Sequence, residues 1–117
     1  TKEGIENCNL IAEKLTGTKS TLFAPPSGAY GKNTLIAAAA LKMKVILWSR
    51  DTVDWRDHDA SLIFRRATEK TTDGDFILMH PTKQTAAALK DVLAYYRTHS
   101  LKAVTVSECL SATAAPQ

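Results

Sequence analysis

The 117 residues suffice for one domain with a real core, but they are few for a closed barrel. Fifteen Lys and Arg against twelve Asp and Glu give a formal charge of +3, and the scatter of the basic residues argues against a nucleic-acid partner. No apolar stretch approaches the ~20 residues of a membrane span. Cys8 and Cys109 lie far apart without the spacing of a zinc knuckle, and they leave a disulfide undecided.

The first predicted elements are a helix, a short strand and a rigid loop. Thr1 opens directly into a helical pattern without a start methionine, so we expect the sequence to begin inside a longer gene product. Apolar residues at helical spacing run from Ile5 to Leu15, and Thr16-Gly17 supplies a stop signal. Thr21 to Ala24 predicts a strand. Pro25 to Gly28 can continue neither a strand nor a helix and therefore predicts a shaped loop.

The middle of the chain predicts a helix, a strand and a second helix. Asn33 is expected to cap a helix from Thr34 to Lys42, whose alanine run allows close packing on a sheet. Residues 45–48, Val-Ile-Leu-Trp, predict the clearest strand, and their lack of alternation is typical of a parallel strand covered on both faces. A loop at 51–55 and a helix at 61–69 follow.

The last third repeats the alternation. Asp73-Gly74 is a turn signal ahead of a third strand at 76–79, and Thr82 is expected to cap a long helix that ends near Ser100. The remaining predicted elements are a strand at 103–105, a short helix at 107–110 and a loose tail at 112–117.

One incoming helix followed by four strand-helix units predicts an α/β protein with about four parallel strands. Either an open doubly wound domain or part of a (β/α) barrel fits this order, and both place ligands at the carboxyl ends of the strands. Three segments fall at that edge: Pro25–Gly28, Asp51–Trp55 and His80-Pro81.

Each chemically useful side chain at this edge also has a structural interpretation. His80 is either an acid/base group or a histidine satisfied by a backbone carbonyl at a strand end. Asp54, taken alone, is more typical of a helix cap or a turn former. Trp55 is more often a packing residue than a platform for substrate.

Three ordered motifs carry a resemblance that covers the chain from about Thr1 to Leu110. They are Phe-Ala-Pro-Pro-Ser-Gly-Ala-Tyr at 23–30, Trp-Ser-Arg-Asp-Thr-Val-Asp-Trp at 48–55 and Ile-Leu-Met-His-Pro at 77–81. Together they resemble the carboxyl-terminal part of the polysaccharide deacetylase family, known as the NodB homology domain or carbohydrate esterase family 4. The Ala-Pro-Pro-Ser-Gly and His-Pro-Thr forms look most like its sporulation-associated branch.

The resemblance implies an irregular, open (β/α) barrel, of which residues 1–111 would be the carboxyl-terminal portion. It implies removal of N-acetyl groups from amino-sugar polymers such as peptidoglycan or chitin-like glycans. A divalent metal, often zinc, would activate the attacking water in the full-length parent. It also implies an extracellular or envelope-associated bacterial protein.

The resemblance further implies roles for individual residues. His80 would be the general acid that protonates the leaving sugar amine, and Asp54 would accept a hydrogen bond from its ring. Ser27 would offer its backbone N–H to the oxyanion of the tetrahedral intermediate. The substrate pocket would be lined by Pro26, Tyr30, Trp55 and Leu78.

The sequence departs from the family pattern in three ways. Ala24 stands where the family commonly has an arginine that positions the catalytic aspartate, and Ser27 replaces a tyrosine. The paired aspartates and the His-x-x-x-His that supply the base and the metal ligands do not occur, so no metal ligand set is expected on this chain. We therefore expect a fragment that is inactive alone, with open sheet edges that favour self-association.

Two other functions remain open. One is a non-catalytic glycan-binding or structural protein of the spore or envelope, with a degenerate site as Ala24 hints. The other is an unrelated small α/β domain.

Overall fold

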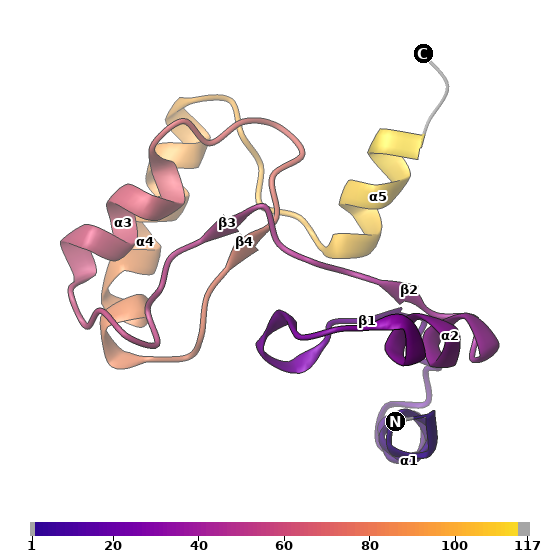
Figure 1. Cartoon of the computed structure of the whole chain (residues 1–117). Coiled ribbons are helices and arrows are strands. Elements are labelled where there is room, and N and C mark those ends of the chain that lie inside the picture. The colour runs from indigo at the N-terminus through magenta and orange to yellow at the C-terminus, as the bar shows by residue number, and fades with distance from the viewer. Residues whose placement is uncertain (1, 115–117) are drawn as a thin grey trace. The chain divides into compact units, whose positions relative to one another are not determined.

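The structure, a computed structural model, describes residues 2–114, with side chains up to residue 111. The chain forms two compact units that meet in sequence between Leu47 and Trp48, and each is considered by itself (Figure 1). Within the described residues, no helix combines the length and the apolar character needed to cross a membrane.

The first unit is a small α/β arrangement around one parallel strand pair. Strand β1 pairs with β2 in parallel, with Leu22 opposite Lys44 and Phe23 opposite Val45. The elements in chain order are α1 (Lys2–Thr16), β1 (Leu22–Phe23), the 3-10 turn η1 (Pro26–Gly28), α2 (Lys32–Ala40) and β2 (Lys44–Val45).

The core of the first unit joins α1, α2 and the strands. Its buried side chains are Ile5, Ala37, Ala38 and Met43, with Phe23, Leu41 and Val45 packed against them. The small side chains of the alanine run therefore let α2 pack closely against its neighbours, as expected.

The ends of the helices in this unit test two sequence expectations. The stop after α1 is confirmed: Gly17 adopts a left-handed φ of 74°, and its N–H donates to Glu13 O at 2.7 Å. The prediction that Asn33 caps α2 was wrong, because the helix begins earlier, at Lys32, and Gly31 is its N-cap. Thr34 satisfies the Gly31 N–H through its hydroxyl at 3.4 Å.

The second unit is built around another pair of parallel strands. Strand β3 pairs with β4 in parallel, with Arg50 opposite Ile77 and Asp51 opposite Leu78. Its elements are β3 (Arg50–Asp51), α3 (Ala60–Thr68), β4 (Ile77–Leu78), α4 (Lys83–Thr98) and α5 (Val106–Ala114).

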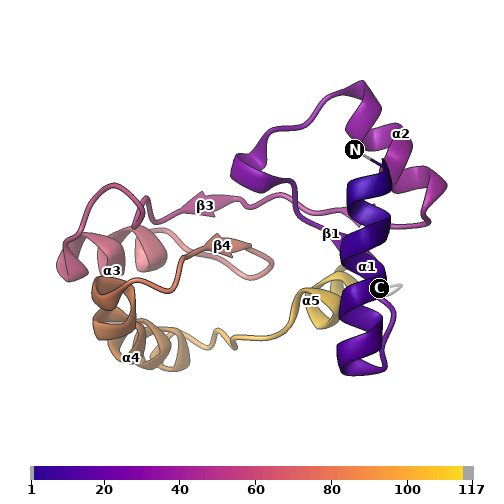
Figure 2. The ribbon, with the colours of Figure 1, turned by 90° about the horizontal axis from the view of Figure 1, so that it is seen from below.

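Helices α3 and α4 lie side by side, as both views of the ribbon show, and α3 also contacts β3 (Figures 1 and 2). Ala67, Val92 and Tyr96 form the buried centre of this packing. The Tyr96 hydroxyl donates to Ala67 O at 2.7 Å, so the phenol is buried without an unsatisfied polar group. Helix α3 begins after its N-cap, Asp59, which was not predicted from the sequence. The Asp59 carboxylate accepts a hydrogen bond from Ser61 N–H at 3.0 Å.

The α/β class with parallel strands is confirmed, but two strand predictions were wrong. The apolar run 45–48 is not one strand: β2 ends at Val45 and β3 begins at Arg50. Residues 103–105 are irregular because they pair with no strand in the described part of the chain. Helix α5 then runs to Ala114, past the expected end at residue 110, and the last three residues of the expected tail lie outside the described residues.

Candidate functional site

The site of the second unit begins with the turn that follows β3. Thr52 is fully buried, and its hydroxyl and its N–H both donate to Leu78 O, at 2.8 and 3.3 Å, which ties the ends of β3 and β4 together. Val53 then adopts a left-handed φ of 53°, an uncommon conformation for a β-branched residue. Its N–H donates to the Asp51 carboxylate at 2.8 Å. This reversal of the chain brings the next residue, Asp54, to the end of β4.

Asp54 and His80 form a hydrogen-bonded pair at this edge. The ring Nδ1 of His80 lies 2.8 Å from Asp54 Oδ1, and the backbone N–H of His80 donates to Oδ2 at 2.6 Å. The Asp54 side chain has no exposed surface, whereas that of His80 is 44% exposed. The carboxylate is thus a buried anchor, whereas part of the imidazole is exposed to solvent.

The electrostatics of the pair favour an ionised Asp54. Burial alone would raise the pKa of this carboxyl, but hydrogen bonds from the His80 backbone, the Thr85 hydroxyl and the His80 ring outweigh it, so the pKa lies below its usual value of 3.8. An ionised carboxylate only accepts hydrogen bonds, so Nδ1 of His80 carries a proton and donates it. The other ring nitrogen, Nε2, is then the one left for proton transfer.

The amino end of α4 supplies a third partner for Asp54. The Thr85 hydroxyl donates to Asp54 Oδ2 at 2.7 Å, and Thr85 itself is buried. Thr82 caps the helix as predicted, since its hydroxyl accepts the Thr85 N–H at 3.0 Å. The carboxylate therefore joins the ends of β3 and β4 to the start of α4.

An ion-pair cluster holds the rest of the loop against α3. Arg66 on α3 donates to Thr52 O at 3.1 Å and to the Asp57 carboxylate at 2.7 Å. Arg56 also binds Asp57, at 3.0 and 3.1 Å. Arg56 first and then Arg66 lower the pKa of Asp57 to about 2. The side-chain hydrogen bonds of Arg56 thus go to Asp57, its neighbour in sequence.

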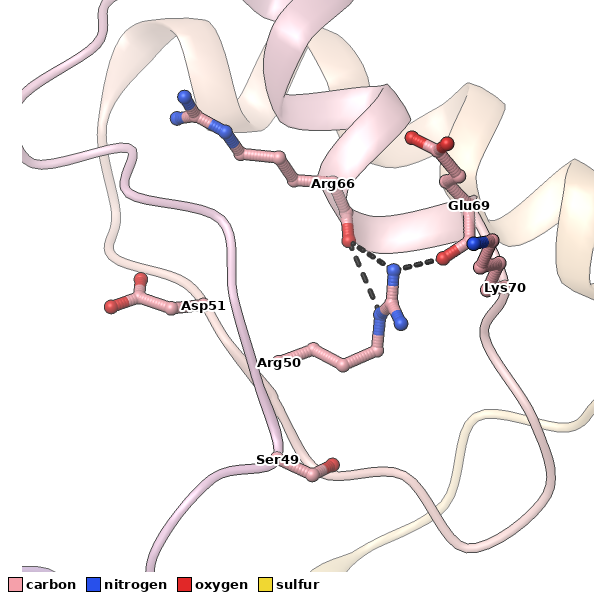
Figure 3. A pocket seen from close by; sticks show the side chains of 6 residues that line it. All are labelled: Ser49, Arg50, Asp51, Arg66, Glu69 and Lys70. Carbon is pink, nitrogen blue, oxygen red and sulfur yellow. Dashed lines mark hydrogen bonds between the residues drawn. The ribbon is translucent and has the colours of Figure 1, made fainter.

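A shallow pocket lies between β3 and the end of α3, and neither Asp54 nor His80 is among the residues that line it (Figure 3). The guanidinium of Arg50 crosses it and donates to Arg66 O at 3.1 and 3.3 Å and to Glu69 O. These carbonyls belong to the last turn of α3, so Arg50 caps the helix. The pocket is lined by Ser49, Arg50, Asp51, Arg66, Glu69 and Lys70.

Two other residues expected at the site belong to the second unit. Leu78 is half-buried in β4, two residues before His80, and its carbonyl accepts hydrogen bonds from Thr52. The Trp55 side chain follows Asp54 directly and is 57% exposed, so core packing does not explain it.

The expected oxyanion donor lies in the turn η1 of the first unit. Hydrogen bonds from Gly28 N–H to Pro25 O at 2.9 Å and from Ala29 N–H to Pro26 O at 3.1 Å close the turn. Ser27 takes a left-handed φ of 58°, and its N–H takes part in neither bond. Tyr30, after the turn, is 52% exposed. The predicted shaped loop is confirmed, and the expected site residues in and after it, Pro26, Ser27 and Tyr30, are all exposed.

The residues present do not make a metal site by themselves. Within residues 2–114, no group of three or more histidine, cysteine, aspartate or glutamate side chains could hold a metal ion. Asp54 and His80 offer two donors, and both carboxylate oxygens already accept hydrogen bonds. This pair therefore does not fit the divalent metal that the sequence resemblance implies.

Sequence reasoning missed the partners that hold the pair. Thr52, Arg66 and Thr85 each contribute a hydrogen bond to this region, and none was singled out. One signal was available for Thr85: it stands three residues after the helix cap Thr82, where capping boxes place a side chain that turns back.

No protein-family model matches the sequence. Among curated proteins, the uncharacterized protein YlxY of Bacillus subtilis is 33% identical over 111 residues, which make up 95% of this chain and 35% of that protein. The peptidoglycan-N-acetylglucosamine deacetylase PgdA of Listeria monocytogenes is 34% identical over 94 residues, 80% of this chain and 20% of PgdA. The chain thus spans about a third or less of the length of these relatives.

Solved structures give the same result. BA3943 of Bacillus anthracis, described as a pseudoenzyme of carbohydrate esterase family 4, matches with a TM-score of 0.88 and 29% identity, over 93% of this chain and 39% of BA3943. A mutant of it with restored enzymatic activity matches with a TM-score of 0.89. The chain's short parallel strands and helices correspond to part of the (β/α) barrel of these proteins. The chain therefore belongs to carbohydrate esterase family 4, the polysaccharide deacetylases, and corresponds to a carboxyl-terminal part of their domain.

Proposed function

We propose that this chain is the proton-donor part of a metal-dependent deacetylase that removes N-acetyl groups from an amino-sugar polymer of the bacterial envelope, peptidoglycan or a chitin-like glycan. The observation that carries the proposal is the 2.8 Å bond between Asp54 and the ring of His80. Relatives named as peptidoglycan deacetylases support the substrate class and the place in the envelope.

His80 is the general acid in this proposal. Breaking the C–N bond of an acetamide requires a proton on the leaving nitrogen, because an unprotonated amine anion is a very poor leaving group. Asp54 orients the imidazole through Nδ1, which leaves Nε2 as the nitrogen that gives the proton. The exposed Trp55 and the half-buried Leu78 would then line the substrate site.

Ser27 contributes through its backbone. An N–H that takes part in neither bond of its turn can donate to an oxyanion, and the change from tyrosine to serine leaves that group in place. Because residues 2–114 hold no metal ligand set, the metal and the catalytic base would come from another part of a longer protein, and we expect the 117 residues alone to be inactive.

The test is acetate release from chitin oligomers and peptidoglycan by the longer protein, with and without added zinc or cobalt. We expect release that depends on metal and that falls by 10²- to 10⁴-fold in His80→Ala, an order-of-magnitude range for loss of a general acid. His58→Ala is the matched control, because His58 is exposed in a loop of the same unit. Full activity in His80→Ala would show that His80 is not the proton donor.

A second candidate function is supported by the likeness to BA3943, a pseudoenzyme in its wild-type form. In that case the chain would be part of a non-catalytic glycan-binding or structural protein, with Ala24 as one sign of a degenerate site. The absence of acetate release from a folded, metal-loaded longer protein, together with retained binding to insoluble glycan, would favour this function over the first.

A further inference from the structure

The Asp54 carboxylate has three hydrogen-bond donors, and only one of them comes from outside the pair. Two belong to His80, its ring Nδ1 and its backbone N–H. The third is the hydroxyl of Thr85 on α4, at 2.7 Å from Oδ2. Thr85 is therefore the contact through which the helix can fix the orientation of the carboxylate independently of the histidine.

The direction of the hydrogen bonds at Thr85 follows from simple counting. A hydroxyl carries one proton, and an ionised carboxylate has none to give, so the Thr85 proton points to Asp54. The contact of 2.7 Å between the hydroxyls of Thr85 and Thr82 must then use the proton of Thr82. Thr82 in turn accepts the Thr85 N–H at 3.0 Å. The helix start thus forms a directed chain from Thr82 through Thr85 to the carboxylate.

This arrangement differs from an ordinary helix cap. In a capping box, the side chain three residues after the cap returns to the backbone of the cap residue. Here the corresponding side chain, Thr85, leaves the helix and binds Asp54. A residue that served only the helix would not need this contact.

We propose that Thr85 is a positioning residue, which holds the Asp54 carboxylate so that His80 keeps its proton on Nδ1 and leaves Nε2 for proton transfer. Without the Thr85 hydroxyl, Oδ2 keeps only the His80 N–H, and the carboxylate can rotate away from the ring. The neutral ring can then also adopt the tautomer that carries its proton on Nε2. Only the catalytic consequence rests on the proposed function, because the state of the ring is a property of this chain.

The experiment is long-range ¹H–¹⁵N NMR of the histidine rings at a pH where they are neutral, which reports the nitrogen that carries the proton. We expect Nδ1–H at His80 in the wild type and in Thr85→Ser, and a mixture with Nε2–H in Thr85→Val. The exposed His58 serves as an internal reference for the form favoured in water. Asp54→Asn is the positive control, because an amide can donate to Nδ1 and force the proton to Nε2.

A wild-type pattern in Thr85→Val, with the expected change in Asp54→Asn, would overturn the proposal. If Thr85→Val does not fold, the wild type still decides: the Thr85 hydroxyl proton should exchange slowly and show a cross-peak, and fast exchange with solvent would contradict the directed chain. In the longer protein, Thr85→Val should lower kcat about tenfold with little change in KM, and Thr85→Ser should restore it. Absence of acetate release from every form would count against the deacetylase function alone, since the NMR result does not depend on it.

Discussion

Two turns of this chain use the same unusual backbone conformation, but they are held in different ways. Ser27 in the first unit and Val53 in the second have left-handed φ values of 58° and 53°. The turn at 25–28 is closed by two backbone hydrogen bonds within five residues. The turn at 52–54 is followed by local bonds from Arg56 N–H and Asp57 N–H to Val53 O, at 3.1 and 2.9 Å. Unlike the first turn, it is also held by Leu78, His80 and Thr85, which lie 26 to 31 residues further along the chain.

The two turns therefore depend on side chains to different degrees. A turn closed by its own backbone tolerates side-chain changes, because the groups that define it remain. A turn that places a β-branched residue in the left-handed region persists only when its surroundings determine it. At 52–54 the long-range bonds depend on the buried side chains of Thr52, Asp54 and Thr85, so we expect substitutions of these residues to cost far more than substitutions at 25–28.

The largest expected effect is at Asp54. Asp54→Ala removes the acceptor of three hydrogen bonds: the His80 N–H and ring lose their partner, and the Thr85 hydroxyl keeps only its contact with Thr82. We expect the free energy of unfolding to fall by about 3 kcal/mol, measured by urea denaturation. Asp54→Asn should cost only about 1 kcal/mol, because its carbonyl can replace one oxygen while its amide faces the ring. Equal losses in the two variants would mean that the hydrogen bonds do not determine this turn.

The next effect is at Thr52. Thr52→Val keeps the shape of a fully buried side chain but removes the hydroxyl that donates to Leu78 O at 2.8 Å. The Thr52 N–H still reaches the same carbonyl at 3.3 Å, so that group keeps one partner. We therefore expect a loss of about 1 kcal/mol in urea denaturation. An unchanged midpoint would show that the backbone bond alone joins the two strand ends.

A smaller effect is expected in acid, through Asp57. Its pKa of about 2 lies below the ordinary 3.8, so the folded chain binds fewer protons than the unfolded chain between these values. The stability from Asp57 is complete above pH 3.8 and is lost as the pH falls to about 2. In Asp57→Asn, the free energy of unfolding should depend less steeply on pH in this range. Asp73→Asn, which makes the same chemical change at an exposed turn residue, is the control.

The smallest effect is expected at Ser27. Ser27→Ala removes an exposed hydroxyl and leaves both backbone bonds of the turn intact. We expect a change within 0.5 kcal/mol, the approximate limit for surface substitutions. A loss as large as that of Thr52→Val would remove the contrast between the two turns.

The same contrast explains which features could be predicted from sequence. The loop at 25–28 and the stop at Gly17 were predicted, because proline and glycine act through local backbone geometry. Strand extents were not, because the apolar run 45–48 and residues 103–105 extend only where a partner strand pairs with them.

The candidate site follows the same rule. The hydrogen bond between Asp54 and His80 was expected from the family resemblance, not from local pattern, since the two residues are 26 positions apart. Thr85 was missed because its role depends on a contact across 31 positions with a carboxylate whose orientation the sequence does not encode locally. Helix caps such as Thr82 are predictable because donor and acceptor lie within one turn.

The central claim is that Asp54 is an ionised anchor whose hydrogen bonds outweigh its burial. The most direct test is the titration of its carboxyl carbon by ¹³C NMR in the wild-type chain. We expect a midpoint below the usual pKa of 3.8, because the His80 and Thr85 donors stabilise the charged form. A midpoint above 3.8 would show that burial prevails and that the three bonds do not form in solution, which would contradict the account.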